Sequence, residues 1–313
     1  MLPIQSDLEE TYARIGHLVH RTPVLTSRLI DQTSDAKVYF KCENFQKSGS
    51  FKMRGALNAI SSLSEEQQGA GVVTHSSGNF GQAVALSASN LGVDAHIVMP
   101  ENAPAVKKEA VASYQGEIIQ CESTVEARER EAAKIVNSKG ATFLHPSNQI
   151  EVILGNATAG MELLQEVPDL DVLMTPVGGG GLLAGNALAA HYFGEDCRVI
   201  GAEPSRVDDA YRSLQSGKIE SNSRIDTIAD GLRTTLGDVN FPIIKQLVER
   251  IILVEEEEIV AAMRLVWERL KIIIEPSCAV PVAALLKEPD LFRNQRVGII
   301  LSGGNVDLSR LPF

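Results

Sequence analysis

A lysine stands where a helix would ordinarily avoid one. Lys52 follows a Ser-Gly-Ser turn and precedes apolar residues with a helical period, so it falls in the first turn of a predicted helix that Ser50 would cap. The positive end of the helix dipole disfavours an ammonium group, and burial beside Phe51 would lower the pKa of the amine. A neutral lysine amine is the nucleophile of Schiff-base chemistry. The alternative is a solvated lysine that tolerates a small dipole penalty, and this stretch alone leaves both interpretations open.

Three glycine-containing turns each follow a short apolar run. They occur in "VVTHSSGNFGQA" (72–83), "LMTPVGGGGLLAG" (173–185) and "VGIILSGGNVDL" (297–308). Ligands of open α/β sheets bind at the carboxyl ends of strands, where such turns gather. Glycines let the backbone come close to a ligand, and the N–H groups at a helix start bind anions. We therefore expect ligand contacts at these turns.

The strongest of the three turns is the run of four consecutive glycines at 178–181. A glycine costs about 0.5–1 kcal/mol relative to alanine within regular structure, and an ordinary turn needs only one or two. We interpret the run as a phosphate-binding nest. Its spacing up to Ala184 also fits a dinucleotide fingerprint, with Glu203 as the ribose-binding acid. That alternative, an NAD-dependent oxidoreductase, does not account for Lys52 or for the other two turns.

The segment "SSGN" at Ser76–Asn79 offers two hydroxyls, an amide and several backbone N–H groups before a predicted helix. This set suits a carboxylate or another small anion. An ordinary helix cap with a spare serine is the alternative. The segment is not a GxSxG nucleophile elbow, which argues against a hydrolase.

The composition is that of an ordinary globular protein. The 313 residues are 44% hydrophobic and 22% charged, enough for one large or two medium domains. The net charge of -11 argues against nucleic acid or an anionic membrane as the main partner. No apolar run is long enough to cross a bilayer, and Met1–Glu10 has no signal-peptide pattern. The four cysteines form no CxxC pair, so we expect free thiols and a cytoplasmic location.

The elements that must position these residues alternate along the chain. Predicted strands are Lys37–Cys42, Gly71–His75, Ala95–Met99, Glu117–Cys121, Asp171–Val177, Val199–Glu203 and Val297–Leu301. Predicted helices include Gly81–Leu91, Thr124–Ser138, Val152–Glu166, Leu182–Tyr192 and Glu257–Leu270. This alternation predicts an α/β fold with parallel sheets covered on both faces.

Together these segments resemble the fold-type II pyridoxal-phosphate enzymes, and among them most closely the serine racemase and serine/threonine dehydratase family. The resemblance lies in "SGSFKMRGA", "SSGNFGQA", "GGGGLLAG", "AEPSRVDDA", "TIADGL", "LVWERLKIIIEPS" and "LSGGNVDL", in this order over nearly the whole chain. It implies a two-domain open twisted parallel-sheet fold like that of the tryptophan synthase β subunit. Residues 1–65 and 148–313 would form a large cofactor-binding domain, and residues 66–147 a small mobile one. It also implies a homodimer.

The resemblance further implies roles for single residues. Lys52 would form the Schiff base and act as base on one face of the substrate, with Ser77 as acid/base on the other. The cofactor, pyridoxal 5'-phosphate, would be held by Phe51, Lys52, Asn79, Gly178, Gly179, Gly180, Gly181 and Ser302. The substrate would be bound by Ser76, Ser77, Gly78, Asn79, Asp230 and Gly231.

The reaction that the resemblance implies is removal of the α-proton of serine and its return to the other face, which interconverts L- and D-serine. Loss of the β-hydroxyl would instead give pyruvate and ammonia. A dehydratase for L-threonine, or an ammonia-lyase for L-threo-3-hydroxyaspartate, with incidental racemisation is the alternative. Phe80 departs from the family, because many relatives have a histidine there and phenylalanine neither titrates nor donates a hydrogen bond. The ratio of the two reactions therefore stays open.

A divalent cation is also implied. Its ligands would be Glu203, the backbone carbonyl of Val207 and Asp209, a set of oxygens that suits Mg²⁺, with Ca²⁺ or Mn²⁺ as substitutes. The alternative is that these acids are surface charges on a loop. ATP activates some serine racemases, but the resemblance assigns it to no residue of this chain.

Overall fold

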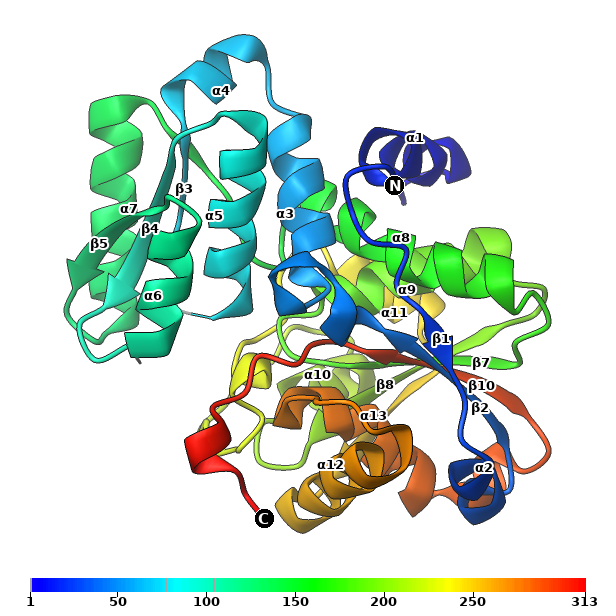
Figure 1. Ribbon diagram of the computed structural model, residues 1–313. Coiled ribbons are helices and arrows are strands. Elements are labelled where there is room, and N and C mark those ends of the chain that lie inside the picture. The colour runs from blue at the N-terminus through cyan, green and yellow to red at the C-terminus, as the bar shows by residue number, and fades with distance from the viewer. Residues whose placement is uncertain (1, 77, 104) are drawn as a thin grey trace.

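The computed structural model describes residues 2–76, 78–103 and 105–313, and the strands of these residues form two sheets (Figure 1). The larger sheet has the order β1-β2-β10-β7-β8-β9, and the smaller has the order β5-β4-β3-β6. The strands of the larger sheet are β1 (Val24–Leu25), β2 (Lys37–Cys42), β7 (Val172–Pro176), β8 (Arg198–Pro204), β9 (Arg250–Val254) and β10 (Arg296–Leu301). Those of the smaller sheet are β3 (Val72–Thr74), β4 (Ala95–Pro100), β5 (Glu117–Cys121) and β6 (Thr142–Phe143). Within the described residues all neighbouring strands are parallel except β1 and β2.

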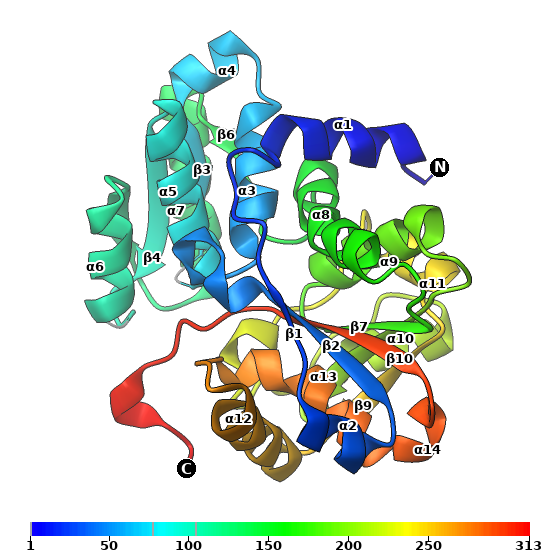
Figure 2. The same ribbon diagram turned by 45° about the vertical axis from the view of Figure 1, so that its right-hand side comes forward.

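Helices cover both faces of each sheet (Figures 1 and 2). Around the larger sheet they are α1 (Gln5–Ile15), α2 (Arg28–Ser34), α8 (Ile150–Glu166), α9 (Gly181–Phe193), α10 (Asp209–Ser216), α11 (Phe241–Leu247), α12 (Glu256–Leu270), α13 (Pro276–Lys287) and α14 (Pro289–Phe292). Around the smaller sheet they are α3 (Lys52–Ser61), α4 (Glu65–Ala70), α5 (Asn79–Leu91), α6 (Ala105–Ser113) and α7 (Val125–Lys139). One core of the larger sheet packs against α12 and α13, and the other packs against α8 and α9. The predicted α/β fold is thus confirmed.

The sequence missed three strands. β1 and β6 have two residues each, which is too short to show a period. β9 is a short apolar run, and periodicity alone cannot tell such a run from a piece of buried helix. All the strands predicted from the sequence are present, with their ends shifted by no more than a residue or two.

The predicted cap of α3 is wrong. The helix begins at Lys52, and its cap residue is Phe51, with no side-chain capping bond. Ser50 has an extended backbone and forms an isolated antiparallel bridge with Gly303. Its hydroxyl oxygen is buried and has no hydrogen-bond partner among the described residues. Pairing with the segment after β10 has therefore replaced the local cap that the sequence suggested.

The two sheets form separate lobes, and α3 leads from the larger one to the smaller one (Figures 1 and 2). The smaller sheet lies within residues 66–147, the range that the sequence resemblance gave to a small domain. Those boundaries and the mobility of that domain stay a prediction. Within the described residues, none of the helices combines the length and apolar character that crossing a membrane requires.

Candidate active site

Lys52 is partly buried at the start of α3, between the two lobes. Its Nζ donates a hydrogen bond to the carbonyl oxygen of Pro146 over 2.7 Å. The ring centroids of Phe51 and Phe80 lie 4.9 and 5.6 Å from the same nitrogen. Burial lowers the pKa of Lys52 to about 8, although the nearby Glu275 carboxylate opposes the shift. The amine is therefore neutral in an appreciable fraction near neutral pH, which nucleophilic chemistry requires.

The Ser-Gly-Ser turn before Lys52 lies against the turn that follows β10. Besides the bridge of Ser50 with Gly303, the backbone N–H of Phe51 donates to the carbonyl oxygen of Ser302 over 3.0 Å. Ser302 is buried, and its hydroxyl lies beside the thiol of Cys278. One of the three predicted turns, at 297–308, thus meets the Ser-Gly-Ser turn at the start of α3.

The "SSGN" turn reaches the same place through Asn79. Its Nδ2 donates to Oε1 of Glu275 over 2.8 Å, and its Oδ1 accepts a hydrogen bond from Nδ2 of Asn305 over 3.0 Å. Ser76 and Gly78 precede α5, and the Gly78 N–H donates to the Ser76 hydroxyl over 3.4 Å. Ser77, the predicted acid/base, lies outside the described residues.

The glycine run links β7 to α9, and its neighbours leave no room for side chains. A Cβ on Gly178 would lie 2.8 Å from Cα of Leu232, and one on Gly181 would lie 2.8 Å from the carbonyl oxygen of Ser147. Gly179 and Gly180 are equally enclosed, and Gly180 also has a left-handed φ of 78°. In the part of the chain that the structure describes, no side chain caps the N-terminus of α9. Its first N–H groups are thus available to an anion.

Asn240 holds the glycine run in place. Its Nδ2 donates to the carbonyl oxygens of Gly179 and Ser147, over 2.8 and 3.1 Å. The asparagine is fully buried, and it lies at the start of α11, about sixty positions after the glycines. Sequence reasoning missed it because no local pattern marks a side chain that bonds so far along the chain.

Asp230 and Gly231 lie beside the glycine run. The carbonyl oxygen of Gly231 is 3.1 Å from the place a Cβ on Gly178 would take, and its N–H donates to the hydroxyl of Ser277 over 3.1 Å. Asp230 forms an ion pair across the lobes, with its Oδ2 3.0 Å from Nζ of Lys107 in α6. The sequence did not single out Lys107, which stands among other charged residues.

Glu275 is a further group that the sequence did not single out. It is buried between the lobes, and burial together with the negative charge of Asp230 raises the pKa of its carboxyl to about 7. The signal that could have found it is a single acid after the apolar run "III" at 272–274. A carboxyl group in apolar surroundings with a pKa near neutrality is a candidate for proton transfer or for orienting other groups.

The predicted cation ligands Glu203 and Asp209 are fully buried, so the interpretation as surface charges is wrong. Oε1 and Oε2 of Glu203 accept the N–H groups of Ala210 and Tyr211, over 3.0 and 2.8 Å. Burial and the charge of Asp209 raise the pKa of Glu203 well above its usual value, and burial raises that of Asp209 to about 6. Val207 is buried in the turn between them.

The charge of this pair suits a bound cation, because two buried carboxylates repel one another unless a positive charge lies between them. Among the described residues, however, no cluster of three or more His, Cys, Asp or Glu side chains could hold a metal. A cation here would need the Val207 carbonyl and water as further ligands. The dinucleotide alternative fits less well, because the buried Asp209 adds a second negative charge beside Glu203, which a ribose hydroxyl would not neutralise.

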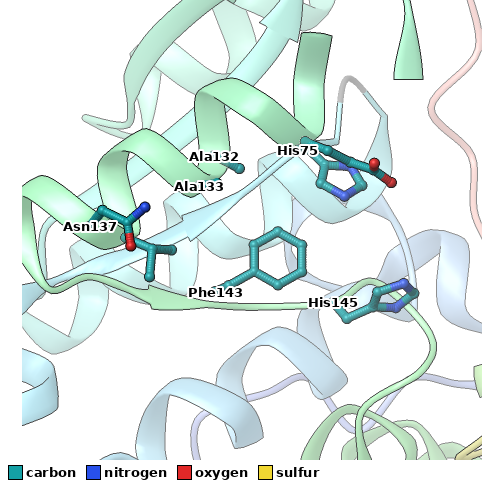
Figure 3. Close-up of a pocket in the computed structure, with 8 residues that line it drawn as sticks. His75, Ala132, Ala133, Asn137, Phe143 and His145 are labelled. Atoms are coloured by element: carbon teal, nitrogen blue, oxygen red, sulfur yellow. The ribbon is translucent and has the colours of Figure 1, made fainter. Parts of the chain in front are cut away.

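A cavity of about 400 Å³ lies beside the smaller sheet (Figure 3). His75 at the end of β3, Phe143 in β6, His145 and one face of α7 line it. Nδ1 of His145 accepts the N–H groups of Ser147 and Asn148, over 3.2 and 2.8 Å. Burial and the nearby positive charges lower the pKa of His145 to about 4, so its ring is neutral at pH 7. The two residues after His145 lead from the cavity toward the other groups. Pro146 accepts the hydrogen bond of Lys52, and Ser147 packs against Gly179 and Gly181.

The geometry fits pyridoxal phosphate. The aldehyde needs a lysine amine that can lose its proton, and Lys52 has a lowered pKa. The phosphate needs free N–H groups, and the uncapped start of α9 provides them. Polar groups for the ring are present in the buried Ser302, whose carbonyl bonds Phe51 next to Lys52, and in the Asn79 amide, which bonds Glu275 near the same amine.

Comparisons with known proteins agree with this fit. A sequence family described as "Pyridoxal-phosphate dependent enzyme" matches residues 15–303. Serine racemase of Dictyostelium discoideum is 48% identical over 97% of this chain and 95% of its own, and its crystal structure superposes with a TM-score of 0.93 over 97% and 98% of the two chains.

Two further relatives carry other names. The beta-hydroxyaspartate dehydratase of Paracoccus denitrificans is 42% identical over 100% of this chain and 99% of its own. The L-threo-3-hydroxyaspartate ammonia-lyase of Saccharomyces cerevisiae is 45% identical over 99% of this chain and 95% of its own. Because the family match covers nearly the whole chain and the residues around Lys52 suit the cofactor, this chain belongs to the pyridoxal-phosphate dependent enzymes of fold type II.

Proposed function

We propose that this protein is a serine racemase that also eliminates water from serine. The observation that carries the proposal is Lys52, a partly buried amine with a lowered pKa, which follows a turn that pairs with the segment after β10, where Asn305 bonds Asn79. Similarity to the Dictyostelium discoideum enzyme over nearly the full length supports serine as the substrate.

We assign the cofactor contacts from the geometry. The N–H groups around Gly178–Gly181 would hold the phosphate, and the Ser302 hydroxyl would meet the pyridine nitrogen. Asn79 would donate from Nδ2 to the ring oxygen, and Phe51 would pack near the ring. Bound pyridoxal phosphate would supply an electron sink for the charge that develops at the substrate Cα.

The protein's own groups would then move the protons. Lys52, neutral in part at pH 7, would take the α-proton onto Nζ. Ser76, Gly78 and Asn79 would hold the substrate carboxylate, and Asp230 and Gly231 would face its side chain. A proton returned by Ser77 from the opposite face would give D-serine. Departure of the β-hydroxyl with a proton releases one water, and hydrolysis takes one water up, which leaves pyruvate and ammonia.

A second candidate is an elimination reaction on 3-hydroxyaspartate, because one relative is named a beta-hydroxyaspartate dehydratase and another an L-threo-3-hydroxyaspartate ammonia-lyase. Such a substrate has a second carboxylate, which needs a positive partner. Lys107 of the smaller lobe is a candidate, but it already pairs with Asp230. A dicarboxylate would compete with Asp230 for this lysine, so the geometry favours serine or threonine.

The first test reduces the holoprotein with borohydride and maps the adduct by mass spectrometry. We expect a yellow protein that bleaches, with the label on Lys52. Incubation with L-serine, L-threonine and L-threo-3-hydroxyaspartate, followed by assays of D-serine and keto acids, then separates the candidates. A Ser77→Ala variant should lose D-serine formation and keep more of the elimination. A colourless protein that binds NAD, or an adduct on another side chain, would contradict the proposal.

We also propose that Glu203, Asp209 and the carbonyl of Val207 bind Mg²⁺, with Ca²⁺ or Mn²⁺ as substitutes. The support is the buried, mutually repelling pair of acids. Magnesium should raise the Tm of the wild type, because a ligand of the folded state stabilises it by about 2.7 kcal/mol at a hundred times its Kd. Asp209→Asn should abolish this rise. Asp208→Asn, whose side chain pairs with Arg212 at the surface, should keep it.

We further propose a cytoplasmic homodimer. Phe45 and Ile273, on neighbouring segments joined by a hydrogen bond from Asn44 to the Ile273 carbonyl, are 45% and 46% exposed and would suit contact with a second copy. Sedimentation should give twice the mass of one chain, and a monomer at micromolar concentration would contradict the dimer. ATP remains a candidate activator without an assigned residue, and the assays above should be run with and without it.

A further inference from the structure

Asn305 belongs to the turn after β10, and the proposed function gives it no role. Its Nδ2 donates to the carbonyl oxygen of Ser48 over 2.8 Å and to Oδ1 of Asn79 over 3.0 Å. Gly49 has a left-handed φ of 73°, and a Cβ on it would overlap the Asn305 amide. The Asn305 side chain is therefore packed closely across the turn that leads to Lys52.

The hydrogen bonds fix which way each amide faces. The two ends of an asparagine amide have nearly the same shape, so its neighbours decide the orientation. The Ser48 carbonyl can only accept, so the Asn305 atom that faces it must be the nitrogen. The same nitrogen faces Asn79, so the Asn79 atom on that side must be the oxygen. Asn79 thereby turns its Nδ2 the other way, toward Glu275.

Glu275 cannot fix this orientation alone. The pKa of its carboxyl is raised to about 7, so the group is partly protonated near neutral pH. A protonated carboxyl can donate as well as accept, and it would bind either end of the Asn79 amide. The backbone carbonyl of Ser48 can only accept, so it fixes the orientation of the Asn305 amide. The Asn305 amide in turn fixes the orientation of the Asn79 amide.

We propose that Asn305 is a positioning residue that holds the Asn79 amide with its Nδ2–H groups on the Glu275 side, away from Asn305, where one of them would reach the cofactor. The inference rests on the proposed function, in which Asn79 donates to the ring oxygen of pyridoxal phosphate. A reversed Asn79 would place its own oxygen against that ring oxygen, and two acceptors repel. Asn305 would thus affect the cofactor without touching it.

The test compares two substitutions at one position. Asn305→Asp keeps the shape but places an acceptor opposite Ser48 and Asn79, so Asn79 should reverse. Asn305→Ala removes the hydrogen bonds without adding a repulsion. We expect Asn305→Asp to weaken cofactor binding by about tenfold or more and to shift the visible absorption of the bound cofactor, and Asn305→Ala to weaken binding only a few-fold. Asn44→Ala, which removes a neighbouring amide that bonds the Ile273 carbonyl, should leave both unchanged.

The deciding measurement repeats these substitutions in an Asn79→Ala background. If Asn305 acts through Asn79, Asn305→Asp should have no further effect there on affinity or spectrum. A full effect in that background, or equal binding by Asn305→Asp and Asn305→Ala, would overturn the inference. If Asn305→Asp does not fold, Asn305→Ala in the two backgrounds gives the same comparison. If the wild type carries the adduct on Lys52 but Asn305→Asp has wild-type cofactor affinity and spectrum, only this inference is contradicted. If the wild type lacks that adduct, the proposed function itself is contradicted.

Discussion

At the scale of single residues, Glu275 has the clearest consequence for pH. Its pKa is raised from 4.5 to about 7 by burial and by Asp230, so between these values the folded state binds more protons than the unfolded state. The stability that this group contributes is fully present below about pH 4.5 and is lost as the pH rises through 7. His145 acts in the opposite direction over part of this window, because its pKa is lowered to about 4.

A Glu275→Gln variant of the apoprotein isolates this contribution. The Tm of the wild type minus the Tm of the variant should decrease as the pH rises from 4.5 to 7. His145 does not contribute to this difference, because it affects both proteins equally. Thermal unfolding at several pH values measures it. Glu257→Gln, at an exposed position, should run parallel to the wild type. A Glu275→Gln curve that also runs parallel would show that Glu275 ionises normally.

At the scale of elements, α6 of the smaller lobe is tied to the segment Asp230–Leu232 of the larger lobe. The tie is the ion pair of Lys107 with Asp230, whose side chains are 26% and 49% exposed. Because Asp230 also lies beside Gly231 and the glycine run, closure of the small domain on the substrate would depend on this contact. We propose that the pair favours the closed arrangement of the lobes.

Substitution of Lys107 by methionine should lower kcat/KM for serine by about twofold to fivefold, which is the range expected of a partly exposed ion pair. Binding of the cofactor and its absorption should stay unchanged, because Lys107 pairs with Asp230, which is not one of the proposed cofactor contacts. Steady-state kinetics and the cofactor spectrum check both points. Lys108→Met is the matched control, since among the described residues Lys108 bonds the Glu101 carbonyl within its own lobe and no group of the larger lobe. Equal losses in the two variants would exclude a special role for the pair.

At the scale of the whole molecule, a buried group of four charges joins β2, α3 and α8. Lys41 lies 2.7 Å from Glu162, and Arg54 lies 2.8 Å from both Glu43 and Glu162. All four side chains are fully buried, and their charges sum to zero. Arg54 is two positions after Lys52 on α3, so the group fastens the helix that carries the reactive amine to the larger lobe.

Removing one member should be costly, because its partners are left buried and unpaired. We expect Glu162→Gln to lower the free energy of unfolding by about 3–5 kcal/mol. Chemical denaturation measures the loss, and Glu166→Gln, at an exposed position on the same helix, should change it little. A Lys41→Met change added to Glu162→Gln should recover part of the loss. A cost below about 1 kcal/mol for Glu162→Gln would mean that the group does not fasten α3.

The sequence by itself determined the α/β class, the strands of more than two residues except β9, the glycine run and the place of Lys52 in a first turn. These features depend on short-range rules: the period of apolar residues, the backbone freedom of glycine and the dipole of a helix start. The resemblance to the family added the roles, because it draws on several segments together.

Only the tertiary structure decided which polar group meets which. The contacts of Asn79 with Glu275 and Asn305 join residues about two hundred positions apart, and they exist because the start of α5 lies beside the start of α13 and the turn after β10. The loss of the Ser50 cap, the burial of Glu203 and Asp209 and the pairing of Lys107 with Asp230 likewise depend on how distant elements pack together. A side chain takes the partner that the packing of the elements brings within reach, and neighbouring residues in the sequence do not specify it.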